Sequence, residues 1–126
     1  MNNIDKFRFS FRNAITGIKT AFKTQRNLRV HFIVGILVLV FSIFLRVSLI
    51  ELSLLVVTIA LVFIAEVFNT AIEKTVDLIT PEYNKQAKIA KDIGASGVLI
   101  TAVFAILIGL IIFLPKIANL IEYFYK

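Results

Sequence analysis

Apolar residues dominate four stretches of the chain, and their spacing predicts a helix in each. In the first stretch, apolar side chains recur at steps of three and four, the period of one helix face, and basic residues follow one position later. The apolar positions are Phe7, Phe11, Ile15, Ile18 and Phe22, and the basic ones are Arg8, Arg12, Lys19 and Lys23. This pattern favours an amphipathic helix in the membrane interface over residues 1–31. A helix that packs on a soluble core is the alternative.

The other three stretches predict membrane-spanning helices over residues 32–50, 52–80 and 93–114. A bilayer core of roughly 30 Å needs about 20 helical residues. The third stretch has 22 residues without a charge and is the clearest span. The fold class expected is therefore an all-α integral membrane protein with three spans behind an interfacial helix.

Three short segments should separate or end these spans. Arg46 begins a tight hairpin expected over residues 46–51 and should direct its charge toward the surface. Pro81 should stop the second span, because helices usually end before a proline, and a loop is expected up to Gln86. Pro115 and Lys116 are expected to end the third span.

Small residues form a ladder with a period of four in the third span. Its members are Gly97, Thr101, Ala105 and Gly109. Small side chains allow a second helix to approach closely in a membrane. We therefore expect the ladder to mark a helix contact.

Composition agrees with a membrane protein of one domain. Of 126 residues, 59% are hydrophobic, and the mean hydropathy is +0.90. The chain has no cysteine, which excludes disulfides, thiolate metal sites and cysteine nucleophiles. The net charge is +6, and the charged residues lie beside apolar runs, so an anionic membrane surface is a better partner than nucleic acid.

The basic residues also predict an orientation. Seven lysines and arginines precede the first span and four lie between Lys74 and Lys91, whereas the first hairpin has Arg46 alone. The positive-inside rule places the N-terminus and the second loop in the cytoplasm. We expect a multi-pass protein of the cytoplasmic (inner) membrane, with any active site on the cytoplasmic side.

The second span carries a row of polar residues on one helix face. Glu66, Asn69, Glu73 and Asp77 are spaced by three, four and four, which aligns them at about 100° per residue. Ionisable groups within a membrane helix are costly and mark functional sites by default. Carboxylates with an amide oxygen suit Mg²⁺, which commonly binds oxygens of substrate phosphates as well. The alternative without a function is a solvated helix end with ordinary surface pairs, and it fits Asp77 better than Glu66.

Two further groups lie near this row. Lys91 and Asp92 begin the third span at the same expected surface, and lysines there suit phosphates. His31, beside the first span, is interpreted as an interfacial anchor. No glycine-rich phosphate loop occurs, so a nucleotide would have to be bound by side chains carried on helices.

These residues resemble the signature of the small prokaryotic diacylglycerol kinase family, E-x-x-N-(S/T)-A-I-E-x-x-V-D followed by A-K-D. The matching segments are residues 65–73 (AEVFNTAIE), 76–78 (VDL) and 90–92 (AKD). The N-terminal segment and the ending IFLPK are similar to the branch that includes undecaprenol kinases. The resemblance implies a homotrimer that transfers the γ-phosphate of MgATP to a lipid alcohol.

The resemblance also implies a role for each matching residue. Glu66 would be the general base, with Asn69 in support. Glu73 would bind the metal, while Lys91, Asp92 and Asp77 would bind the nucleotide. The family usually has a glutamate as a second metal ligand where this chain has Gln25, whose amide oxygen can ligate Mg²⁺ but brings no charge.

Three function classes remain open at this point. A lipid kinase acting on undecaprenol or diacylglycerol is the first, and the sequence does not decide between these lipids. A small transporter would use Glu66 and Asn69 to bind a cation, but it should place them near the membrane midplane within internal repeats. A non-enzymatic membrane scaffold would leave the clustering of the acids unexplained.

Overall fold

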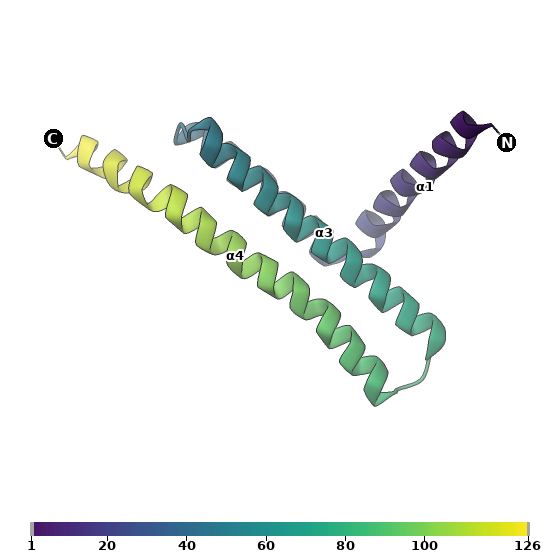
Figure 1. Ribbon diagram of the computed structural model, residues 1–126. Helices are drawn as coiled ribbons and strands as arrows, with labels where there is room; N and C mark the ends of the chain where they lie inside the picture. The colour runs from purple at the N-terminus through teal and green to yellow at the C-terminus, as the bar shows by residue number, and fades with distance from the viewer. Residues whose placement is uncertain (1, 126) are drawn as a thin grey trace.

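The computed structural model describes residues 2–125, which form four α-helices and no strand. The helices are α1 (Asn3–Thr24), α2 (Arg26–Phe44), α3 (Leu49–Ile79) and α4 (Lys85–Phe124). Figure 1 shows α3 and α4 side by side as a long antiparallel pair, with α1 leaving them at an angle. The helices α2, α3 and α4 are long and apolar enough to cross a membrane, which confirms the three expected spans.

The break between α1 and α2 falls at Gln25, earlier than the boundary expected after residue 31. Gln25 has an extended backbone, with φ −104° and ψ 116°. Arg29 stabilises the break, because its Nη1 donates to the carbonyl oxygens of Phe22 (2.8 Å) and Lys23 (3.1 Å) at the end of α1. The spanning helix α2 therefore starts at Arg26, and its first turn joins it to α1.

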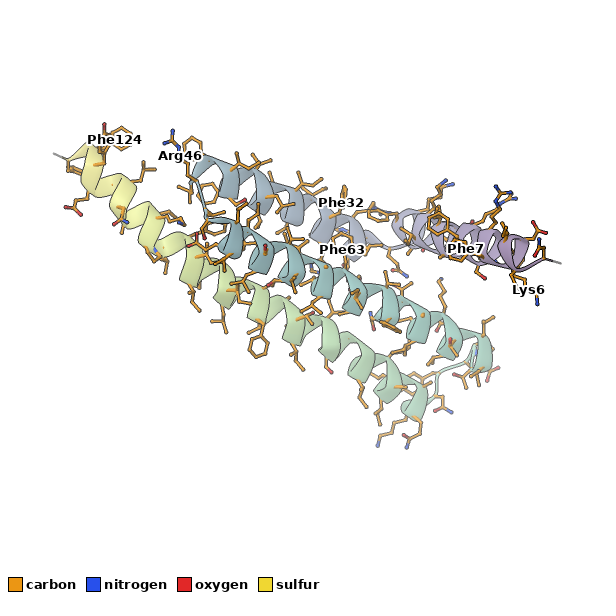
Figure 2. All side chains as sticks on the ribbon, turned by 45° about the horizontal axis from the view of Figure 1, so that its top comes forward. Lys6, Phe7, Phe32, Arg46, Phe63 and Phe124 are labelled. Carbon is orange, nitrogen blue, oxygen red and sulfur yellow. The ribbon has the colours of Figure 1, made fainter. Side chains whose placement is uncertain are left out.

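Three phenylalanines connect the N-terminal half of the molecule. The ring centroids of Phe22, Phe32 and Phe63 lie 5.3 to 6.2 Å apart, so α1, α2 and α3 meet at one aromatic cluster. Figure 2 shows Phe32 and Phe63 beside each other, with Phe7 far out along α1. The rest of the apolar stripe of α1 is exposed, including Phe7 and Phe11. The position of α1 in the membrane interface stays a prediction.

The hairpin between α2 and α3 is as tight as expected. Arg46 has a left-handed backbone (φ 51°), and Ser48 caps α3 in a reciprocal capping box with Glu51. The backbone N–H of Ser48 donates to Glu51 Oε2 at 2.6 Å, and the N–H of Glu51 donates to Ser48 Oγ at 3.3 Å. These two bonds satisfy donors that a helix start otherwise leaves unpaired.

We predict that Ser48→Ala lowers the free energy of unfolding by about 1 kcal/mol, the usual cost of losing an N-cap. Ser53→Ala is the matched control, because Ser53 Oγ only donates to the carbonyl of Leu49 within the helix. Thermal unfolding of both variants in detergent micelles measures the difference. Equal melting temperatures would show that the capping box does not contribute.

The helix α4 continues through Pro115 to Phe124, so the expectation that Pro115 ends it was wrong. An interior proline removes one helix hydrogen bond and usually breaks the helix. Here the turn after the proline is attached to α3, because Lys116 Nζ lies 3.0 Å from Glu51 Oε2. Arg46 and Phe124 lie toward the same end of the molecule in Figure 2, as this ion pair requires.

The helices α3 and α4 pack along shielded positions spaced by three and four. On α4 these include Gly94, Val98, Thr101, Ala105, Ile108 and Ile112, and on α3 Leu55, Thr58, Val62, Glu66, Asn69 and Glu73. The ladder expected from the sequence only partly coincides with this seam. A Cβ on Gly97 would meet nothing within 4 Å, and one on Gly109 would meet only Phe113 of its own helix. A period of four rotates away from a seam whose period is nearer 3.5.

Candidate active site

The polar row of α3 is buried against α4 over part of its length. Glu66 is 2% exposed and Asn69 is 7% exposed, while Glu73 is half-buried and Asp77 is exposed. Asn69 Nδ2 donates to Glu73 Oε1 at 3.1 Å. The structure therefore brings three of the four expected residues together on one face and leaves Asp77 at the open end of the helix.

Two oxygens in this row have no hydrogen-bond partner among residues 2–125. They are Glu66 Oε2 and Asn69 Oδ1, and both atoms are buried. Leaving a buried acceptor unsatisfied costs about 1 to 3 kcal/mol, and more for a charged group. Native structures contain few such atoms, and each suggests a missing donor or cation. The two oxygens are therefore candidates for contact with a ligand.

His31 of α2 interacts electrostatically with Glu66, as does Glu73. The histidine also lines an apolar cavity of about 570 Å³ bounded by α2, α3 and α4. The sequence interpretation of His31 as an interfacial anchor did not include this interaction with Glu66. Its spacing of four from Asn27 puts both on one face of α2, but only tertiary packing shows which face meets Glu66.

The opposite end of the row meets the start of α4. Lys91 Nζ lies 2.7 Å from Asp77 Oδ1, which connects the two helices across the loop. Asp92 instead pairs with Lys88 of its own helix at 2.6 Å. Of the three residues expected at the nucleotide, the structure brings Lys91 and Asp77 together and leaves Asp92 on a different pair.

A hollow of about 280 Å³ lies beside this ion pair. The residues that line it come from the end of α3, the loop and the start of α4. They include Asp77, Glu82, Tyr83, Asn84, Lys88 and Lys91. Asn84 is also the N-cap of α4, because its Oδ1 accepts from the N–H groups of Gln86 (2.8 Å) and Ala87 (3.2 Å). The lining of the hollow therefore includes the N-cap of α4 and two lysines.

The two expected metal ligands are Glu73 and Gln25, and their binding of one ion stays a prediction. Among residues 2–125, no three aspartate, glutamate or histidine side chains lie close enough to bind a metal ion. Gln25 is half-buried at the break between α1 and α2, and its side chain does not cap α2. The oxygens of Glu66, Asn69 and Glu73 still fit a Mg²⁺ that takes its other ligands from phosphates and water.

The fold and this site define a class: a small multi-pass membrane protein whose middle span carries a polar row with Glu66 and Asn69 buried, and which has lysines at the end of the row. Residues 12–113 match the family described as prokaryotic diacylglycerol kinase. The chain belongs to this family and is a lipid kinase by class, a phosphotransferase with an alcohol acceptor.

Curated relatives are similar over most of the chain. An undecaprenol kinase of Bacillus subtilis is 40% identical over 116 residues, covering 92% of this chain and 94% of that protein. A diacylglycerol kinase of Synechocystis sp. is 41% identical over 112 residues, covering 88% of this chain but 64% of that protein. A diacylglycerol kinase of Escherichia coli is 34% identical over 91 residues, covering 72% of this chain and 75% of that protein.

Proposed function

We propose that this protein transfers the γ-phosphate of MgATP to the hydroxyl group of a membrane lipid alcohol, undecaprenol or diacylglycerol. The observation that carries the proposal is the buried Glu66 with an unpartnered Oε2, beside the Asn69–Glu73 hydrogen bond. A carboxylate with a free oxygen can accept the proton of a hydroxyl that reaches it. Solvated surface acids, as in a scaffold, would not leave such an oxygen buried.

The reaction assigns a separate task to each residue of the row. The lipid hydroxyl oxygen forms a bond to the γ-phosphorus, the bond from that phosphorus to the β-phosphate oxygen breaks, and Glu66 takes the hydroxyl proton. Asn69 supports Glu66 and orients Glu73. Phosphoryl transfer needs positioning and charge neutralisation more than covalent chemistry, and Mg²⁺ supplies that neutralisation when bound.

The nucleotide belongs near the loop end of the row. Lys91 and Asp77 form one side of the hollow there, and Asp92 lies one residue further along α4. Lysine ammonium groups bind phosphates, so Lys91 and Lys88 would exchange their carboxylate partners for phosphate oxygens. Glu73, half-buried between this hollow and Glu66, is the proposed metal ligand, with Gln25 as a second one.

The assembly proposed is a homotrimer with sites shared between subunits. Among residues 2–125, no three aspartate, glutamate or histidine side chains form a cluster, so a neighbouring subunit would add its groups to the oxygens of Glu66, Asn69 and Glu73. The proposed location is the cytoplasmic membrane, with the site on the cytoplasmic side. This orientation follows from the concentration of basic residues before α2 and around the loop after α3.

The direct test uses purified protein in mixed micelles with labelled ATP and Mg²⁺, with either diacylglycerol or undecaprenol. We expect label in one or both lipids and none when Mg²⁺ is removed with a chelator. The ratio of kcat/KM for the two lipids gives the preferred substrate. Label in neither lipid would overturn the proposal and favour a transporter or a scaffold.

A further inference from the structure

We infer that Gly94 of α4 is a positioning residue that holds the Asn69 carboxamide in its working orientation. The inference rests on the proposed function, in which Asn69 supports the general base and orients Glu73. Gly94 lies outside the small-residue ladder expected from the sequence. It is the glycine of α4 on which α3 packs.

The space beside Gly94 is filled by Asn69. A Cβ built on Gly94 would lie 2.8 Å from Asn69 Oδ1, a separation that real Cβ atoms essentially never show. The next nearest atoms are Ile72 Cδ1 at 3.4 Å and Ile72 Cγ2 at 3.5 Å, which are at or near ordinary contact distances. A methyl group at position 94 would therefore conflict with a single group, the carboxamide oxygen.

The same carboxamide makes one hydrogen bond and leaves one acceptor open. Its Nδ2 donates to Glu73 Oε1 at 3.1 Å, while Oδ1 is buried and accepts no hydrogen bond from the part of the chain that the structure describes. If the amide rotates away from a methyl group, both features change, because the nitrogen and oxygen are fixed to one planar group. The absence of a side chain at position 94 thus sets both the Glu73 contact and the direction of Oδ1.

The conflict can be relieved at little cost to the fold. Asn69 has a short side chain that can turn, whereas the backbones of α3 and α4 are held by packing along their seam. Alanine also has a higher helix propensity than glycine. Gly94→Ala should therefore displace the amide and leave the helices in place, which separates a loss of activity from a loss of stability.

The experiment compares Gly94→Ala, Asn69→Ala and the double variant. We expect Gly94→Ala to lower kcat by between about tenfold and a hundredfold, the loss typical of a misplacement near 1 Å, with KM for ATP little changed and the melting temperature not lowered. In the Asn69→Ala background the oxygen is gone, so adding Gly94→Ala should have no further effect. Residues that act as one unit show this non-additivity.

Gly97→Ala is the matched control on the same helix, because its Cβ would meet nothing within 4 Å, and it should keep wild-type kcat. Unchanged kcat in Gly94→Ala would overturn the inference. A multiplicative further loss in the double variant would overturn it too. A lowered melting temperature would also overturn it, since it would mean that α4 had moved instead of Asn69.

A second readout does not depend on catalysis. The side-chain amide signal of Asn69 in a ¹⁵N NMR spectrum is identified by its absence in Asn69→Ala. It should shift in Gly94→Ala and stay in place in Gly97→Ala. If the Asn69 signal shifts in Gly94→Ala but the protein labels no lipid, the contact between Gly94 and Asn69 stands and the kinase reaction is rejected. If the signal stays in place and the protein is an active kinase, only the role of Gly94 is rejected.

Discussion

Glu66→Gln should abolish phosphoryl transfer while the protein stays folded. Glutamine has the shape of glutamate but does not accept a proton at neutral pH, and general-base catalysis typically contributes about 10² to 10⁴ in rate. The buried position favours the neutral amide, because a charge with an unpartnered oxygen is costly to bury. We therefore expect a fall in kcat of that order, with an unchanged or higher melting temperature.

The measurement is the initial rate of label transfer from ATP to lipid at saturating Mg²⁺, together with thermal unfolding of the same preparation. Glu122→Gln provides the matched control, because Glu122 is an exposed glutamate in the last turn of α4, far along the helix from the polar row. It should transfer phosphate at the wild-type rate. A wild-type rate in Glu66→Gln would remove Glu66 from the role of base.

The sequence was sufficient for the features that depend on one helix at a time. The three spans follow from long, mainly apolar stretches, and the alignment of Glu66, Asn69 and Glu73 follows from their spacing alone. The hydrogen bond between Asn69 and Glu73 is an i,i+4 contact, so it too is implicit in the helix. The tight hairpin after α2 was predictable because Arg46 interrupts the apolar run.

Contacts between helices were beyond the sequence. Small residues on α4 occur both at Gly94 and along the ladder from Gly97, and the sequence gives no means of choosing which face meets α3. His31 and Glu66 are 35 positions apart, so their interaction depends on how α2 packs on α3. Asp92 could pair with α3 or with its own helix, and Lys88 one turn earlier is the partner that the structure shows.

Two helix boundaries differ from the prediction because of contacts with other helices. Gln25 ends α1 without a proline or glycine, because Arg29 supplies donors to the final carbonyl groups of that helix. Pro115 does not end α4, because the next residue is held by Glu51 from another helix. In both cases a side chain from another helix, and not the residue type at the boundary, decides where the helix ends.

Glu73→Gln should raise the Mg²⁺ concentration that gives half-maximal activity. The amide of glutamine retains an oxygen that can ligate Mg²⁺ and accept from Asn69 Nδ2, as Glu73 Oε1 does now, but it loses the charge that attracts the cation. Mutating a residue that hydrogen-bonds to a metal ligand typically lowers metal affinity by about tenfold to a hundredfold. Replacing a charged ligand itself should therefore raise the required Mg²⁺ concentration by at least about tenfold. At saturating Mg²⁺, part of the wild-type kcat should return.

The shift is measured by titrating Mg²⁺ at a fixed ATP concentration in the labelling assay. Asp5→Asn removes one carboxylate from the exposed first turn of α1 and should leave the titration unchanged, which controls for net charge. The reverse change at the other proposed ligand gives a stronger test: Gln25→Glu restores a charge near the break between α1 and α2. If Gln25 and Glu73 bind one ion, Gln25→Glu should lower the Mg²⁺ requirement of the wild type and partly rescue Glu73→Gln. A titration curve that neither substitution moves would exclude both residues as metal ligands.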